Sequence, residues 1–106
     1  MQKVVLSMDT SKHDKLIVGL TIDDKEVILE EKFDFKKSQG ILPMIERILK
    51  QNSINVSELT EITINPGPGS FTGLRVGVAI ANTLGLVLQI PVNNNDSGIP
   101  VEPVYE

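Results

Sequence analysis

Two short stretches hold residue types that could do chemistry: an acidic turn near the N-terminus and a glycine-rich loop in the second half of the chain. The turn, Asp9-Thr10-Ser11, places one carboxylate beside two hydroxyl groups directly after an apolar run. The loop, PGPGS at residues 66–70, precedes a long apolar segment. A loop of this kind can present backbone N–H groups to a phosphate at the start of a helix. The candidates for an anion site are therefore Asp9, Thr10, Ser11, Gly67, Gly69, Ser70 and Arg75.

The glycine loop also has a purely structural interpretation, which we favour. It lacks the Lys-Ser/Thr pair of a P-loop and the G-x-G-x-x-G register of a dinucleotide site. A tight turn needs glycine for unusual backbone angles, and Ser70 is well placed to cap the helix that follows. Arg75 would lie over the first turns of that helix. We expect it to form an ion pair with a carboxylate such as Asp9 or, alternatively, to hold an external anion.

Other catalytic chemistry finds little support in the chain. Metal-dependent cleavage at Asp9 would need further carboxylates beside it, and Glu46 is the only other candidate because the adjacent strand ends in Asn65. His13 has no serine or cysteine partner that the sequence identifies, so a protease is not supported either. The chain contains no cysteine, which excludes disulfides and the common zinc sites. We expect neither a metal nor another cofactor.

The elements that position these residues follow from the hydrophobic pattern. Apolar, β-branched runs predict five strands, and two longer runs predict helices. In chain order these are strands at 3–9, 15–23 and 26–35, a helix at 39–52, a strand at 61–65, a helix at 71–88 and a strand at 89–92. Ser38 and Ser70 are the expected N-caps, and Pro43 falls in the first helical turn, where a missing N–H costs least.

The order β-β-β-α-β-α-β predicts an α/β fold of the ribonuclease H-like or actin-like half-domain type. Its mixed five-stranded sheet would combine an antiparallel meander with parallel strands reached through helical crossovers. We assign residues 1–92 to this domain. Residues 93–106 are expected to form a polar linker, NNNDSG, and a proline-containing tail that suits an edge strand or a docked segment.

Bulk properties narrow the classes of partner. With 106 residues and a net charge of −4, the chain is one domain without the basic face that free-standing nucleic-acid binding usually needs, so contact with RNA would be indirect. The N-terminus does not resemble a signal peptide, which makes a cytoplasmic location the expectation. Residues 76–92 are mostly apolar, but Asn82, Gln89 and Pro91 interrupt them, and we expect no membrane span.

The helix expected at 71–88 is apolar on nearly every side, whereas a sheet can cover only one face of it. Small residues recur every four positions, at Gly73, Gly77, Ala81 and Gly85, and would form a shallow groove. The groove could seat the helix on the chain's own sheet or first helix, or it could meet a partner's helices. We favour the partner, because an apolar patch of several hundred Å² is seldom left open to water.

Three motifs carry a family resemblance. Asp9-Thr10-Ser11, ILPMIERIL at 41–49 and GPGSFTGLRVGVA at 67–79 resemble the TsaB (YeaZ) family of bacteria, and the likeness covers residues 1–95 in order. It implies an actin-like ATPase fold without catalysis. TsaB would support TsaD, the subunit that makes N6-threonylcarbamoyladenosine at position 37 of tRNA, and a TsaE-type ATPase would join them. The family has also been called an M22 peptidase homologue.

The resemblance implies an interface formed by both helices, and a homodimer through the same helices when the partner is absent. The residues implied are Leu42, Ile45, Leu49, Gly73, Val76, Gly77, Ile80, Ala81 and Leu84. Two features depart from the family: NNNDSG stands where relatives carry a second lobe, and Asn82 replaces the usual lysine. One lobe is not expected to enclose ATP. The alternative left open is a residual phosphate- or nucleotide-binding enzyme of the actin-like superfamily.

Overall fold

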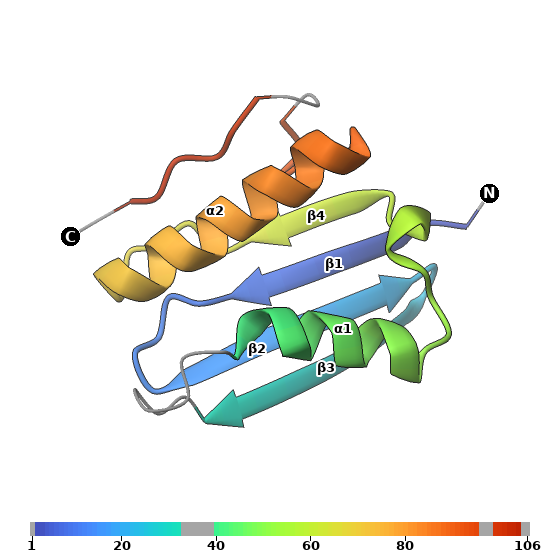
Figure 1. The fold of residues 1–106 in the computed structure, drawn as a ribbon, viewed down its shortest axis with the longest axis horizontal. Coiled ribbons are helices and arrows are strands. Elements are labelled where there is room, and N and C mark those ends of the chain that lie inside the picture. Colours follow the sequence, from blue (N-terminus) through green and yellow to red (C-terminus); the bar gives the residue numbers. More distant parts are fainter. Residues whose placement is uncertain (1, 33–39, 96–98, 105–106) are drawn as a thin grey trace.

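A mixed sheet of four strands carries two helices on one face (Figure 1). The structure, a computed structural model, describes residues 2–32, 40–95 and 99–104. The strands are β1 (Val4–Asp9), β2 (Lys15–Ile22), β3 (Lys25–Lys32) and β4 (Glu61–Ile64). The helices are α1 (Ile41–Gln51) and α2 (Phe71–Leu88), and a short 3-10 turn, η2 (Val56–Glu58), precedes β4.

The strand order is β3-β2-β1-β4. β1 pairs antiparallel with β2, and β2 with β3, as the short turns between them require. β4 pairs parallel with β1, so the chain must cross over before it, and α1 lies in that connection. The predicted meander and helical crossover are therefore confirmed.

The core lies between the sheet and the helices. Val4, Leu6 and Met8 of β1 are buried, while the residues between them are only half-buried, because side chains along a strand alternate between faces. Met44 and Ile48 of α1 belong to the same apolar cluster. In Figure 1, α1 crosses β2 and β3, whereas α2 runs along β4 and β1. The two helices thus cover different halves of one sheet face.

The predicted start of α2 is confirmed, whereas α1 begins two residues later than predicted, with Gly40 as its N-cap and no side-chain cap hydrogen bond. The Ser70 side chain accepts a hydrogen bond from the Gly73 backbone N–H at 3.4 Å, which confirms the predicted cap of α2. α1 begins at Ile41 after Gly40, and Pro43 lies in its first turn as expected. The other expected cap, Ser38, and the predicted end of the third strand at 33–35 lie outside the described residues.

The predicted fifth strand at 89–92 is wrong. This segment makes only one isolated parallel bridge, between Val92 and Ile62 of β4. Two local features prevent a longer ladder. Gln89, which ends α2, adopts a left-handed backbone conformation, and Pro91 has no N–H to donate. The chain reaches the edge of the sheet at a single point and then leaves it.

A side chain completes the edge that the missing strand would have paired. The Ile62 N–H donates to the Pro91 carbonyl at 3.0 Å, and the Asn93 N–H donates to the Ile62 carbonyl at 2.9 Å. Two residues further along β4, the Asn93 side-chain amide makes the hydrogen bonds that a strand backbone would make. Its Oδ1 accepts from Ile64 N at 2.7 Å, and its Nδ2 donates to Ile64 O at 2.8 Å. The Asn93 amide therefore mimics one residue of a neighbouring strand.

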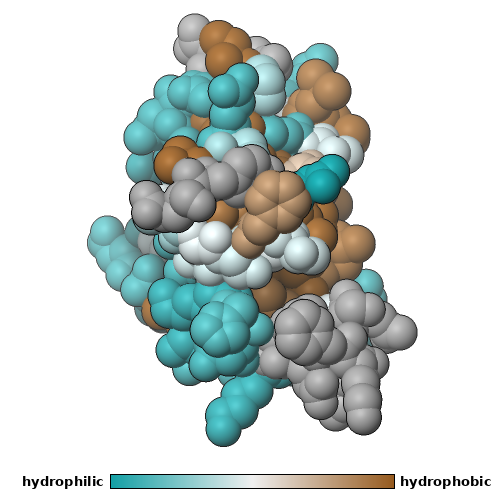
Figure 2. Space-filling view, turned by 90° about the vertical axis from the view of Figure 1, so that its left-hand side faces the viewer, coloured by the Kyte–Doolittle hydropathy of each residue, from teal (hydrophilic) through white to brown (hydrophobic). Residues whose placement is uncertain are grey.

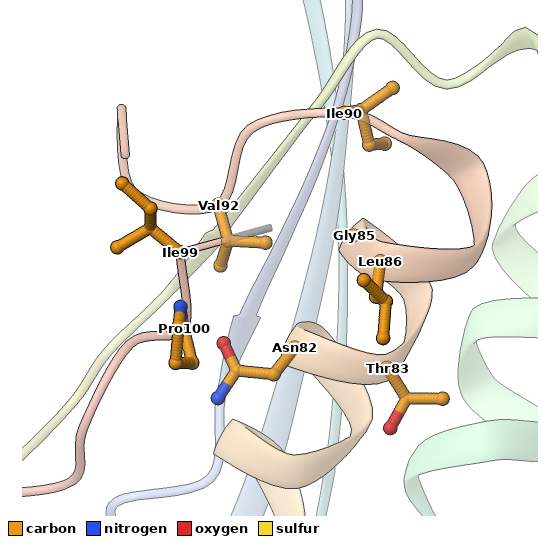
Figure 3. A pocket seen from close by; sticks show the side chains of 8 residues that line it. All are labelled: Asn82, Thr83, Gly85, Leu86, Ile90, Val92, Ile99 and Pro100. Carbon is orange, nitrogen blue, oxygen red and sulfur yellow. The ribbon is translucent and has the colours of Figure 1, made fainter. Parts of the chain in front are cut away.

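The C-terminal tail lies along the outer side of α2 (Figure 1). Asn82 holds it with two hydrogen bonds of 2.8 Å, donating Nδ2 to the Val101 carbonyl and accepting the Val101 N–H at Oδ1. Further on, the Val104 N–H donates to the Pro66 carbonyl at 2.7 Å. Figure 3 shows Asn82 facing the tail beside a cavity of about 230 Å³. Of the two alternatives expected for the tail, an edge strand or a docked segment, the structure shows the docked segment, held by Asn82.

Among the described helices, α2 alone is long and apolar enough to cross a membrane. A core helix can have the same length and composition. Five of its residues are buried within this fold: Leu74, Gly77, Val78, Ala81 and Gly85. In the fold described here, α2 is a sheet-packed helix with a large exposed remainder.

Candidate partner-binding face

The acidic turn and the glycine loop, whose residues were grouped as candidates for an anion site, meet at the end of β1. Asn65 donates its Nδ2 to Asp9 Oδ2 and to Ser11 Oγ, both at 3.3 Å. The Ser70 N–H donates to the Ser11 carbonyl at 2.7 Å. Because β1 and β4 are parallel neighbours, the segments that follow them emerge at the same edge of the sheet.

Asp9 is held as a structural carboxylate. Its Oδ1 accepts the Ser11 N–H at 2.9 Å and the Ser11 hydroxyl at 2.5 Å, and Lys12 Nζ lies 3.7 Å from Oδ2. Burial alone would raise the pKa of Asp9, but the hydrogen bonds from Ser11 and Asn65 and the charge of Lys12 together lower it below its ordinary value. The carboxylate is thus ionised and engaged within the chain.

The predicted ion pair between Arg75 and Asp9 is wrong. Arg75 instead places its guanidinium over the Phe71 ring, 5.5 Å from the ring centroid, on the exposed surface of α2. Residues four apart lie on the same side of a helix, which brings these two together. Lys12, three residues after Asp9, is close enough to take the place expected of Arg75.

The loop at 66–70 uses its backbone donors for its own fold. Gly67 N–H donates to Asn65 Oδ1 at 3.0 Å, while Ser70 and Gly73 N–H groups bond to Ser11 and to the cap, respectively. Gly67 also has φ of +110°, a conformation that favours glycine. These observations support the tight turn over the phosphate cradle.

The stripe of small residues on α2 faces this chain, not an open groove. A Cβ at Gly73 or Gly77 would collide with Thr10, and a Cβ at Gly85 would collide with Val92. Ala81 is completely buried. The expectation that another molecule's helix lies in this stripe is therefore corrected: the small residues let α2 approach its own β1 turn and the segment beside β4.

The apolar surface that stays open lies elsewhere on the helices. Leu42, Phe71 and Val76 expose 57%, 56% and 46% of their surface, and Val87 exposes 72%. Val76 and Val87 lie on the same side of α2 as the half-buried Ile80 and Leu84, because successive members of this set are three or four residues apart. We give the name helix-pair face to these residues taken together with the exposed Leu42 of α1 and Phe71 at the start of α2: Leu42, Phe71, Val76, Ile80, Leu84 and Val87. Figure 2 shows apolar side chains gathered beside hydrophilic ones at the end of the molecule where α2 begins.

Comparison with known proteins decides the family. Residues 32–94 match the family described as TsaD, tRNA N6-adenosine threonylcarbamoyltransferase. The tRNA threonylcarbamoyladenosine biosynthesis protein TsaB of Buchnera aphidicola subsp. Schizaphis graminum is 34% identical over 94 residues, covering 87% of this chain and 43% of that protein. Its counterpart from Bacillus subtilis is 29% identical over 92 residues, 84% of this chain and 39% of that protein. The chain belongs to the TsaB (YeaZ) family.

The fold agrees with that membership. YeaZ from Pseudomonas aeruginosa superimposes with a TM-score of 0.78 at 29% identity, over 85% of this chain and 41% of that one. The α/β architecture is therefore the ribonuclease H-like, actin-like half-domain that the element order predicted, with four strands in place of five. The chain spans about two fifths of the length of the TsaB proteins and of the YeaZ structure that it matches.

The interface residues predicted from the TsaB resemblance fall into three groups in the structure. Leu42 and Val76 are exposed, whereas Gly73, Ile80 and Leu84 are half-buried. The remaining four are buried inside this chain: Ile45, Leu49, Gly77 and Ala81. Sequence reasoning missed Phe71, whose exposed ring could have been foreseen because the first residue after an N-cap lies at the end of the helix, where the sheet covers it least.

Proposed function

We propose that this TsaB-family chain is a non-catalytic partner subunit in the synthesis of N6-threonylcarbamoyladenosine in tRNA. It would act in the cytoplasm, stabilise a TsaD-type catalytic subunit through the helix-pair face, and contact tRNA only indirectly. The same face would pair two copies of the chain when the catalytic subunit is absent. Recruitment of a TsaE-type ATPase would follow from the assembled pair.

The observation that carries this proposal is the exposed apolar surface of α1 and α2. Leu42, Val76 and Val87 expose about half or more of their surface to water, because the sheet covers only one side of each helix. Burying an apolar side chain is favourable by about 1.5–3 kcal/mol. A partner that covers three or four such partly exposed side chains would gain part of this free energy from each, which favours binding.

The absence of catalysis is supported by how the polar groups are used. The Asp9 carboxylate is bound by Ser11 and Asn65, and the Ser70 hydroxyl caps α2. Each of these groups therefore has a structural role, because its hydrogen bonds hold the loop and α2 together.

The test is the affinity of this chain for its cognate TsaD-type protein, measured by isothermal titration calorimetry. Leu42→Glu places a charge on the helix-pair face and should weaken binding by roughly 30-fold or more, as loss of an interface hot spot does. Val56→Glu is the matched control, because Val56 is 42% exposed but lies on η2. Equal affinities for the two variants and the unmodified chain would contradict the proposed interface.

The residual nucleotide-binding enzyme remains the competing proposal. Calorimetry of the chain alone with ATP or ADP and magnesium separates the two. Saturable micromolar binding would favour the enzyme. No binding under conditions in which the TsaD-type protein binds would favour the partner subunit.

A further inference from the structure

A cavity of about 340 Å³ lies where the N-terminal ends of α1 and α2 approach the turn between β1 and β2. Its volume corresponds to roughly ten water molecules at about 30 Å³ each. Leu16 and Ile41 form its buried lining, and the exposed Phe71 and Val76 stand at its mouth. The cavity therefore opens directly into the helix-pair face.

The hydroxyl groups of this cavity differ in how they are used. The Ser70 hydroxyl accepts from Gly73 N–H. The Thr10 side chain is buried and packs against Gly77, and its Oγ1 has no hydrogen-bond partner among the described residues. One buried hydroxyl is fewer than the several convergent polar groups that orient a specific small molecule. What the cavity does offer is apolar wall, with room for one large side chain.

Lys12 is the one formally charged residue among the described lining residues, which include no Asp or Glu. Lys12 and His13 are both exposed, and the His13 imidazole can donate a ring N–H. The first turns of α1 and α2 also lack acidic residues, so the positive ends of both helix dipoles are not neutralised there. Lys12 pairs with Asp9 at 3.7 Å, but such an exposed pair is weak and leaves other ammonium donors free. Although the whole chain has a net charge of −4, the mouth of this cavity favours a negatively charged group of a partner.

We propose that this cavity is the anchor point of the partner interface. It would receive one large apolar side chain of the catalytic subunit, with Lys12 and His13 binding a carboxylate next to that side chain. The inference rests on the proposed function and goes further, because it names the chemistry of the partner segment: an aromatic or aliphatic residue adjacent to an acidic one. Central, desolvated pockets of this kind typically carry most of the binding energy of an interface.

Two variants test the anchor, each with a control. Val76→Trp fills the mouth of the cavity, and Leu86→Trp makes the same kind of change on the opposite flank of α2, where Leu86 is 65% exposed. Lys12→Glu/His13→Glu reverses the rim charge. Lys25→Glu/Gln2→Glu adds negative charge at exposed positions elsewhere. Affinity for the cognate TsaD-type protein is measured at low and high salt, and circular dichroism checks that each variant folds.

We expect Val76→Trp to weaken binding roughly 30-fold. The rim reversal should weaken it about tenfold at low salt, with a smaller effect at high salt. Both controls should bind like the unmodified chain. If Leu42→Glu abolishes binding while Val76→Trp and the rim reversal leave it unchanged, the anchor is refuted and the proposed function stands. If the unmodified chain itself does not bind, the proposed function fails and the anchor with it.

Discussion

Replacing Gly77 by alanine tests whether the small-residue stripe of α2 is filled by this chain. In an exposed helix position, Gly→Ala stabilises by about 1 kcal/mol. At Gly77 the added Cβ would collide with the hydroxyl and methyl groups of Thr10, a side chain that is 1% exposed and cannot swing into solvent. Overpacking of this kind costs about 1–3 kcal/mol. The net expectation for Gly77→Ala is a loss of about 1 kcal/mol.

The collision should ease when most of its partner is removed. In a Thr10→Ala background the hydroxyl and methyl groups are gone and only the β-carbon, 3.0 Å away, stays in tight contact, so Gly77→Ala should cost about 1 kcal/mol less than in the unmodified chain. The two single variants and the double variant then form a cycle with a coupling energy of about 1 kcal/mol. Ala79→Gly, on the exposed side of the same helix, is the control and should cost about 1 kcal/mol in either background.

Equilibrium urea unfolding followed by circular dichroism gives the required free energies. The chain has no tryptophan, so a backbone signal is preferable to fluorescence. For a domain of this size, a change of 1 kcal/mol corresponds to a shift in melting temperature of roughly 5 °C. Stabilisation by Gly77→Ala in the unmodified background, or strictly additive effects in the cycle, would refute the packing of α2 on Thr10.

Three further predictions concern the polar groups that hold the fold. Asn93→Gly should lose about 1–3 kcal/mol of unfolding free energy, because it removes both bonds to Ile64; Asn94→Gly, also at positive φ, should not. Asn82→Ala should raise hydrogen exchange at the Val101 N–H, with Thr83→Ala as the control; unchanged protection would contradict the anchor role of Asn82. The lowered pKa of Asp9 means that its ionised form stabilises the fold above about pH 4, a contribution lost as pH falls through the folded-state value. Asp9→Asn should therefore lower the free energy of unfolding at pH 7, and a difference that persisted undiminished at low pH would count against this.

The elements of the fold were predictable because each leaves a local pattern. The alternation in β1 and the Ser70 cap depend on neighbouring residues only, and both are confirmed. The prediction of a fifth strand was wrong because the short apolar run before Asn93 gives no sign that a side chain, instead of the backbone, pairs with β4. Such side-chain mimicry has no periodic signal in the sequence.

The apolar excess of α2 was predictable from the sequence, but its position on the helix was not. Apolar periodicity indicates that α2 has more apolar surface than a sheet can cover, which agrees with the exposure of Val76 and Val87. The periodicity does not indicate which side of α2 packs on the sheet. The small residues, which were interpreted as a groove for a partner, lie on the side that packs against Thr10. The Arg75 pairing failed for a similar reason, since Lys12 is nearer to Asp9 through a local turn.

The most direct test of the central claim is a methyl NMR titration of this chain with its cognate TsaD-type protein. If the helix-pair face is the binding surface, the methyl signals of Leu42, Val76 and Val87 should shift or broaden. The signal of Ile28, which is 56% exposed on β3 against Gly19 and away from the helices, should stay in place. Perturbation centred on Ile28, with the three helix methyl groups unaffected, would contradict the account.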